Sequence, residues 1–145
     1  MKKITLVTCL FLLSTFGFSQ TQPKLSKLAI TITNIVNKND KNLIIGIYRK
    51  DDSFPTFNTF WKNQIVSVNS NSTTIYFEVP YGEYAIAVSH DVNGNKKLDT
   101  NFFGMPKEPF GFSNNFKPKM SKPDFNDCKF TFSNKNSAIS IKLID

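Results

Sequence analysis

Cysteine, histidine and arginine are all scarce in this chain, and each scarcity removes a class of site. The 145 residues include two cysteines, Cys9 and Cys128, and one histidine, His90. A zinc site of the usual kind needs several His or Cys ligands, so the sequence excludes one. Arg49 is the only arginine. Bidentate recognition of phosphates or bases relies mainly on arginine side chains, so we expect no nucleic-acid partner.

Long apolar runs are also rare, and the one present lies at the N-terminus. Lys2 and Lys3 precede a mostly apolar run over residues 4–18, which is too short to span a bilayer comfortably. Gly17 and Ser19 are small residues at the −3 and −1 positions of a cleavage after Ser19. This three-part pattern is typical of a secretory signal peptide.

We therefore expect residues 1–19 to be a cleaved signal peptide and residues 20–145 to be a single domain, periplasmic or secreted. No later segment is apolar enough for a transmembrane helix. Residues 20–145 carry 16 basic and 11 acidic side chains, a formal net charge of +5. The lysines are scattered, which favours a solvated surface or loose attraction to acidic material, so the expected partner is a cell-envelope or extracellular component.

Only Cys128 would remain after cleavage, so no internal disulfide can form. The domain must then rely on its hydrophobic core, and the chain has fifteen phenylalanines to supply apolar area. Cys128 alternates with Phe130 and Phe132 in a strand pattern, which predicts a small buried core residue on their face. A reactive thiol is the alternative.

Strand patterns run through most of the chain. Residue alternation at 28–33 and 83–90 is typical of half-buried strands, whereas Pro55 interrupts the aromatic segment 54–61 and predicts a loop or edge element. No amphipathic helix of useful length and no internal repeat is present. The fold class predicted is all-β: an Ig-like or transthyretin-like two-sheet β-sandwich of about seven strands. The expected strands are residues 28–33, 43–49, 65–68, 73–79, 83–90, 127–133 and 137–144.

Residues 91–124 have no strand pattern, which is unusual in a compact domain and indicates function or disorder. The segment is rich in phenylalanine, which is costly to leave in water, so we expect one long ordered loop with rings buried beneath it. An exposed aromatic platform that binds a sugar, peptide or lipid is the alternative. The aromatic residues of the loop are Phe102, Phe103, Phe110, Phe112 and Phe116.

The start of this loop has the spacing of a cation-binding segment. Asp91, Asn93, Asn95 and Asp99 supply side-chain oxygens at nearly every second residue, and the Lys97 carbonyl fills the gap. Short oxygen-bearing side chains at that spacing can surround a hard cation, and we expect Ca²⁺ as the cofactor. The alternative is that the same side chains bond to their own backbone in successive Asx-turns.

Two positions depart from the EF-hand pattern. The sixth position, where the sharp turn favours glycine, is Lys96, so either Lys96 is left-handed or the loop bends elsewhere, as at Gly94. The twelfth position is Phe102 rather than a bidentate Glu. A later carboxylate such as Glu108 would have to replace it.

Catalytic residues are not predicted. His90 and Asp91 are adjacent, and neighbours in an extended strand point to opposite faces, which weakens a catalytic pair. The run from Gly111 to Asn115, Gly-Phe-Ser-Asn-Asn, lacks the second glycine of a nucleophile elbow. We expect His90 to play a structural role. A hydrolase that uses His90, Asp91, Asp99 and Glu108 is the alternative.

Several short motifs in order carry a resemblance to a known family. His90-Asp91-x-Asn93-x-Asn95, the segment from Gly104 to Asn115, and residues 123–130 look like the bacterial DUF2141 family, from about residue 28 to the C-terminus. Lys96 and Cys128 stand where that family usually has Gly and Ala. The resemblance implies an exported β-sandwich protein without an established activity. Residues 79–86, with Gly82-x-Tyr84, resemble the strand start of transthyretin-like and carboxypeptidase-regulatory-like sandwiches.

The sequence thus predicts a non-enzymatic exported β-sandwich with a calcium-bound or Asx-turn-stabilised loop at residues 91–99, acting as an envelope or extracellular interaction module. A ligand-binding domain that uses the Phe-rich loop is the second hypothesis.

Overall fold

A computed structural model describes residues 23–36, 41–97, 99–102, 106–119 and 121–144. The expected signal peptide lies outside the described residues. Among the helices that are described, none is long and apolar enough to cross a membrane.

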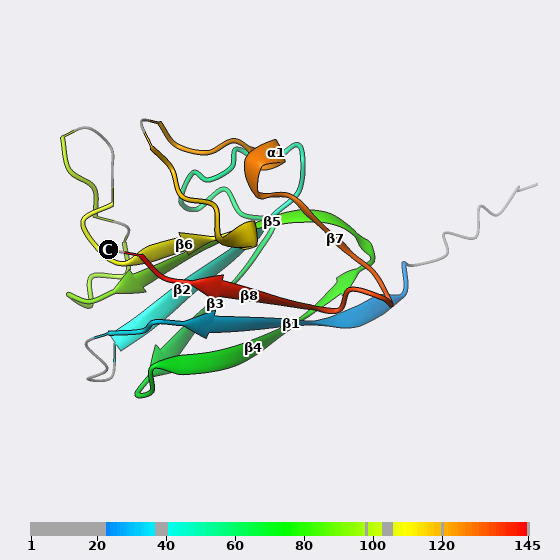
Figure 1. The fold of residues 1–145 in the computed structure, drawn as a ribbon, viewed down its shortest axis with the longest axis horizontal. Helices are drawn as coiled ribbons and strands as arrows, with labels where there is room; N and C mark the ends of the chain where they lie inside the picture. Colours follow the sequence, from blue (N-terminus) through cyan, green and yellow to red (C-terminus); the bar gives the residue numbers. More distant parts are fainter. Residues whose placement is uncertain (1–22, 37–40, 98, 103–105, 120, 145) are drawn as a thin grey trace, which may run out of the picture.

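Strands in two sheets make up most of the described chain (Figure 1), and this is the all-β sandwich that the sequence predicts. One sheet has the order β4-β1-β8, and the other has the order β3-β2-β5-β6, with β7 paired to β5 as well. The described residues form eight strands where about seven were expected. They are β1 Leu25–Thr33, β2 Lys41–Tyr48, β3 Lys62–Val68, β4 Ser72–Pro80, β5 Gly82–Asp91, β6 Phe110–Phe112, β7 Phe130–Phe132 and β8 Ala138–Lys142.

The core lies between the two sheets, and the period of two in each strand decides which side chains enter it. In β1 the alternating Leu28, Ile30 and Ile32 are all fully buried. In β5, Ile86 and Val88 face the same core. The opposite face of β5 carries Ala85, Ala87 and Ser89, with Asp91 following in the same alternation.

The C-terminal residues connect the two sheets. β8 runs parallel to β1, with Ile30 paired to Ile139. Beyond β8, the Leu143 N–H donates to the Thr33 carbonyl at 3.0 Å. Ile144 then exchanges two backbone hydrogen bonds with Phe110 of β6, at 2.8 and 2.9 Å. One side of the sandwich is therefore closed by the end of the chain.

The outer face of the five-stranded sheet is covered by irregular chain. Figure 1 shows α1 (Phe125–Cys128) and the connection between β2 and β3 lying together beside β5 and β6. A second cluster packs there, separate from the inter-sheet core. Its buried members are Ala85, Phe110, Phe112, Phe125 and Cys128, with Phe54 and Phe116 packed against them. The Pro55 segment forms no strand, as predicted.

Two elements differ from the expectation. The segment 91–124 contains a strand, β6, which pairs with β5, and a 3-10 turn at Ser113–Asn115. Cys128 ends the short helix α1, so it does not alternate with Phe130 and Phe132 along one strand. The prediction of a shared strand face was wrong because a helical turn precedes β7. Cys128 is nonetheless fully buried, as expected.

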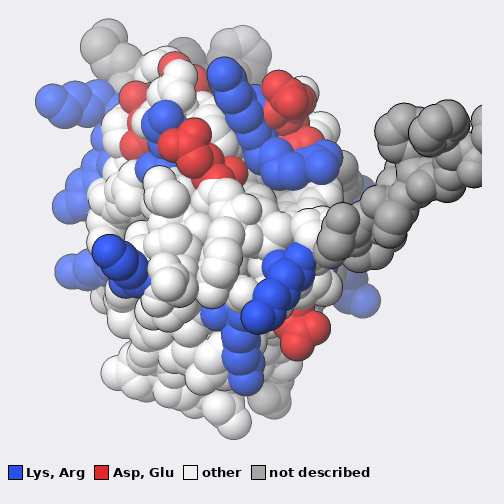
Figure 2. Space-filling model, turned by 90° about the vertical axis from the view of Figure 1, so that its right-hand side faces the viewer, with Lys and Arg blue, Asp and Glu red and all other residues white. Residues whose placement is uncertain are grey.

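Charged side chains are dispersed on the face that Figure 2 shows. Lysine and arginine side chains are spread around a central uncharged area, and acidic side chains lie next to some of them. This face therefore offers no continuous basic stripe of the kind that follows a nucleic-acid backbone.

Candidate functional site

The 91–99 loop is built around the carboxylate of Asp91. Asp91 Oδ1 accepts the backbone N–H groups of Gly94 and Asn95, at 2.7 and 3.1 Å, and Oδ2 accepts that of Lys96 at 2.7 Å. The Asp91 side chain is fully buried. Three N–H dipoles thus converge on one buried carboxylate and offset its desolvation.

The backbone turns sharply where those N–H groups are supplied. Gly94 has a φ of 79° and Lys96 a φ of 58°, so both are left-handed. The sequence left two ways for this loop to bend, and the structure uses both positions. Left-handed backbone is unfavourable for a residue with a Cβ, so Lys96 occupies the glycine position of an EF-hand-like turn at an energetic cost.

The other oxygen-bearing side chains of the loop meet at Asp99. The amide nitrogens of Asn93 and Asn95 both donate to Asp99 Oδ2, the second at 2.9 Å. Their amide oxygens accept backbone N–H groups two residues ahead, those of Asn95 and Lys97, at 3.0 and 2.8 Å. Asx-turns are thus present, and the three side chains also converge on one point.

A cation at that point would meet the Asp99 carboxylate and the two amides. It would need the amide groups of Asn93 and Asn95 to turn so that oxygen replaces nitrogen next to Asp99. Within the described chain, no group of three His, Cys, Asp or Glu side chains is arranged to hold a metal ion. As the loop stands, its carboxylates and amides are engaged in hydrogen bonds within the loop, and a calcium site stays a prediction.

Glu108 is anchored next to the loop rather than in it. Its Oε1 accepts the Val92 N–H at 3.0 Å, and its side chain is 4% exposed. Within the described chain, the second oxygen, Oε2, has no hydrogen-bond partner. Phe102, the twelfth position counted from Asp91, is 98% exposed.

His90 has a structural setting. It lies fully buried near the end of β5, and its backbone N–H donates to the Pro109 carbonyl at 2.8 Å. The cavity described next is lined by none of the four residues of the hydrolase hypothesis, which are His90, Asp91, Asp99 and Glu108. The hydrolase hypothesis therefore gains no support from this cavity.

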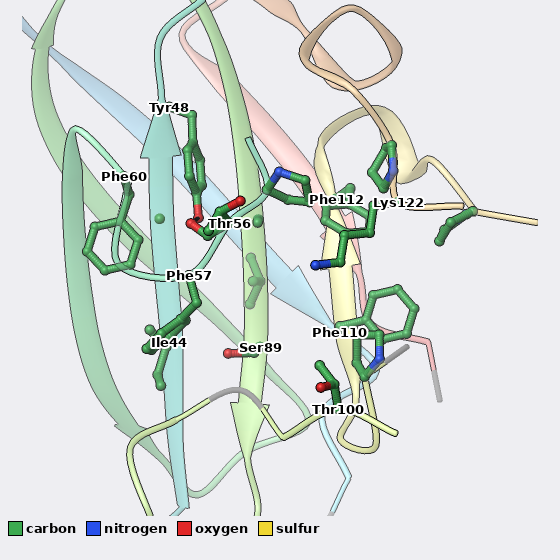
Figure 3. Close-up of a pocket in the computed structure, with 17 residues that line it drawn as sticks. Ile44, Tyr48, Thr56, Phe57, Phe60, Ser89, Thr100, Phe110, Phe112 and Lys122 are labelled. Carbon is green, nitrogen blue, oxygen red and sulfur yellow. Dashed lines mark hydrogen bonds between the residues drawn. The ribbon is translucent and has the colours of Figure 1, made fainter. Parts of the chain in front are cut away.

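A cavity of about 270 Å³ lies on the outer face of the five-stranded sheet. Its floor consists of outward-facing residues of β2 and β5, among them Gly46, Ala87 and Ser89. Its walls come from the β2–β3 connection and from β6. Thr100, Pro106, Pro118, Lys122 and Pro123 complete them. Figure 3 shows these side chains around the space, with Phe57 and Phe60 on one side and Phe110 and Phe112 on the other.

Gly46 is required by the packing of this floor. A Cβ on Gly46 would lie 2.9 Å from Phe60 Cδ1 and 3.1 Å from Tyr48 Cε2. The Phe60 ring therefore lies directly against the backbone of β2. Tyr48 is fixed in turn, because its hydroxyl donates to the Thr56 carbonyl at 3.0 Å and its ring packs edge-on to Phe54. Burial raises the pKa of Tyr48 well above its usual range, and the nearby Asp52 carboxylate adds to the effect.

The Gly-Phe-Ser-Asn-Asn run is structural. Ser113 is fully buried, accepts the Ile86 N–H at 2.9 Å and donates to the Cys128 carbonyl at 2.5 Å. Asn115 accepts the Lys142 N–H at 2.7 Å and so covers the edge of β8. Cys128 is fully buried, and burial raises the pKa of its thiol to about 12, with Asp127 and Asp124 contributing, so its setting is that of a core residue.

Sequence reasoning missed the cavity. Its lining comes from segments far apart in the chain, and only the pairing of β2 with β5 sets Gly46 opposite Ala87. One signal was available: small residues occupy consecutive outward positions, Ala85, Ala87 and Ser89, on one face of a strand pattern. Two of the loop phenylalanines, Phe110 and Phe112, lie in the cavity wall and are 7% exposed.

Fold and loop together define an all-β sandwich with an acidic Asx-rich loop and a small cavity on the outside of one sheet. The chain belongs to the DUF2141 family, described as an uncharacterized protein conserved in bacteria, whose profile matches residues 30–140. No curated protein and no solved structure gave a match. The likeness to transthyretin-like sandwiches stays a prediction.

Proposed function

We propose that this protein is a non-enzymatic module that acts outside the cytoplasm, in the periplasm or beyond the cell, with Ca²⁺ bound by its 91–99 loop. The observation that carries the calcium part is the convergence of Asn93, Asn95 and Asp99 on one point. The left-handed backbone at Lys96 supports it, because cation-binding loops of this spacing turn at the same position.

The role of calcium would be to fix the loop for contact with an envelope or extracellular partner. Lys96 and Lys97 are exposed on this loop, next to the side chains that would bind the ion. Millimolar calcium outside the cytoplasm suits a weak site with few carboxylates, since affinity falls as the number of charged ligands falls.

A melting curve of residues 20–145 in calcium and in chelator tests the proposal. Calcium at a hundredfold above its dissociation constant adds about 2.7 kcal/mol to the free energy of unfolding. We expect Asp99→Asn to abolish this gain, because it removes the charge on which the loop side chains converge. Asp51→Asn is the matched control, since Asp51 is exposed and distant in sequence from the loop, and it should keep the full response.

Equal melting temperatures in calcium and chelator would refute the calcium part and leave the loop as a set of Asx-turns. Magnesium provides a further comparison, because Mg²⁺ sheds its water reluctantly and should stabilise far less.

Export is tested separately on the full chain in a bacterial host. We expect the protein outside the cytoplasm with Gln20 as its first residue, measured by intact mass. Leu12→Arg interrupts the apolar run and should retain the uncleaved chain inside. Recovery of the intact chain, Met1 onward, in the cytoplasm of cells that carry the unaltered sequence would contradict export.

A further inference from the structure

The cavity on the outer face of the five-stranded sheet is a second site, independent of the calcium loop. It is lined on several sides by rings and prolines, and its floor is made of small residues. Such a space, apolar with few polar groups, is the usual form of a small-molecule site.

The hollow depends on small residues in its floor. Gly46 of β2 lies directly opposite Ala87 of β5, and Ser89 follows Ala87 on the same face of β5. Gly46 lets the Phe60 ring lie close to the sheet, and larger side chains at Ala87 and Ser89 would fill the space between the sheet and its covering loops. The rings of Phe60, Phe110 and Phe112 stand around this floor, so a flat or branched apolar group can contact them on several sides (Figure 3).

The lining carries one formal charge, and it is positive. Lys122 lines the cavity, no Asp or Glu does, and Figure 3 shows the amine end of Lys122 turned inward. Among the described residues, Lys122 takes part in neither of the two ion pairs, which join Arg49 to Asp52 and Lys129 to Glu83. A ligand with one negative charge beside an apolar body would complement both the ammonium group and the rings.

The volume limits the size of that ligand. A space of about 270 Å³ lies at the lower end of the range for small-molecule sites. It suits an aromatic or branched acid of about a dozen non-hydrogen atoms better than a long-chain lipid. A free sugar would leave most of its hydroxyl groups facing rings without partners, which is costly.

We propose that this cavity binds a small amphipathic carboxylic acid, with its apolar body over Ala87 and Ser89, beside the Phe60 ring that covers Gly46, and its carboxylate paired with Lys122. The acid is a diffusible small molecule, and the cavity binds it without a chemical reaction. The site differs from the calcium loop in every residue, so each can fail while the other stands.

Phenylbutyrate and phenylbutanol form a matched pair of probes, since they share the ring and chain and differ in charge. Binding is followed by amide chemical shifts of residues 20–145 at millimolar probe. We expect phenylbutyrate to shift residues around the cavity and to bind about fivefold more tightly than the alcohol, the ratio that a partly exposed charge pair supplies.

Three variants assign the result. Lys122→Met should weaken phenylbutyrate about fivefold and leave phenylbutanol unchanged, whereas Lys119→Met, on the same segment but outside the lining, should change neither. Ala87→Leu places a larger side chain in the space and should abolish binding of both probes while the melting temperature holds or rises. Unaltered binding in Ala87→Leu, or equal affinity for acid and alcohol in the unaltered protein, would overturn the proposal. So would the absence of shifts around the cavity.

Discussion

Ser113 joins three segments of the chain through one hydroxyl group. Its oxygen accepts from Ile86 in β5, and its proton goes to the carbonyl of Cys128 at the end of α1. The residue is fully buried, so neither backbone group can turn to water instead. Ser113 stands in a Gly-Phe-Ser-Asn-Asn run that partly resembles a nucleophile elbow, and its hydroxyl group here bonds to backbone groups.

Ser113→Ala should therefore lower the free energy of unfolding by about 1–3 kcal/mol, because it leaves a buried N–H and a buried carbonyl without partners. Urea unfolding measures the change. Ser67→Ala on the exposed face of β3 is the control, and it should stay within about 0.5 kcal/mol of the parent. Equal effects of the two substitutions would show that the Ser113 hydroxyl bonds contribute nothing.

At the scale of the element, the 91–99 loop combines a strained residue with a well-bonded backbone. Lys96 is left-handed, and its N–H nevertheless donates to Asp91. Lys97, its neighbour, is not among the described residues with positive φ. The two lysines therefore differ in backbone conformation while sharing chemistry and exposure.

Lys96→Gly should raise the free energy of unfolding by about 0.5–1 kcal/mol, since relief of the left-handed strain exceeds the added freedom of glycine in the unfolded chain. Lys97→Gly should lower it by a few tenths of a kcal/mol, since glycine there brings only flexibility. Thermal unfolding in chelator compares them without any contribution from calcium. A lower free energy of unfolding in both variants would show that the left-handed backbone of Lys96 is not strained.

The sequence could predict the elements whose residues alternate between apolar and polar over several positions. β1 and β5 alternate strictly, and their expected ranges, 28–33 and 83–90, fall inside the observed strands. β6 has three residues, too few for a period to be visible, and it is defined by its pairing with β5, with Gly111 close to Ile141 and Lys142. α1 is held by reciprocal capping between Asp124 and Asp127. A helix of one turn with these residues looks like an ordinary turn in the sequence.

The candidate site divides in the same way. The loop was predictable because its oxygen-bearing side chains lie within nine residues of one another. Lys96 and Gly94 were alternative bending positions in the sequence, and the structure has positive φ at both. The cavity was not predictable, because it depends on the register between β2 and β5 and on which segments cover them. Local patterns carry no information about either.

At the scale of the whole molecule, the last residues hold the two sheets together. Leu143 is fully buried, and Ile144 bonds to Phe110 across the closed side of the sandwich. A chain that ends at Lys142 should lose roughly 3–5 kcal/mol of its free energy of unfolding, from the lost burial of Leu143 and the lost backbone bonds. That is a large part of the 5–15 kcal/mol typical of a domain.

Urea unfolding again gives the measurement, with a chain that ends at Ile144 as the control because it keeps Leu143 and Ile144. Full stability of the chain that ends at Lys142 would show that the sandwich does not need the connection.

The parallel pairing of β1 with β8 also decides which backbone groups of the smaller sheet stay covered. On one edge, β1 has β8 as its neighbour in the sheet order, and no other strand of that sheet lies on that side. Detachment of β8 would therefore uncover a row of backbone N–H and carbonyl groups along β1. Such an open strand edge can template pairing with a second molecule, so the attachment of β8 also guards against self-association.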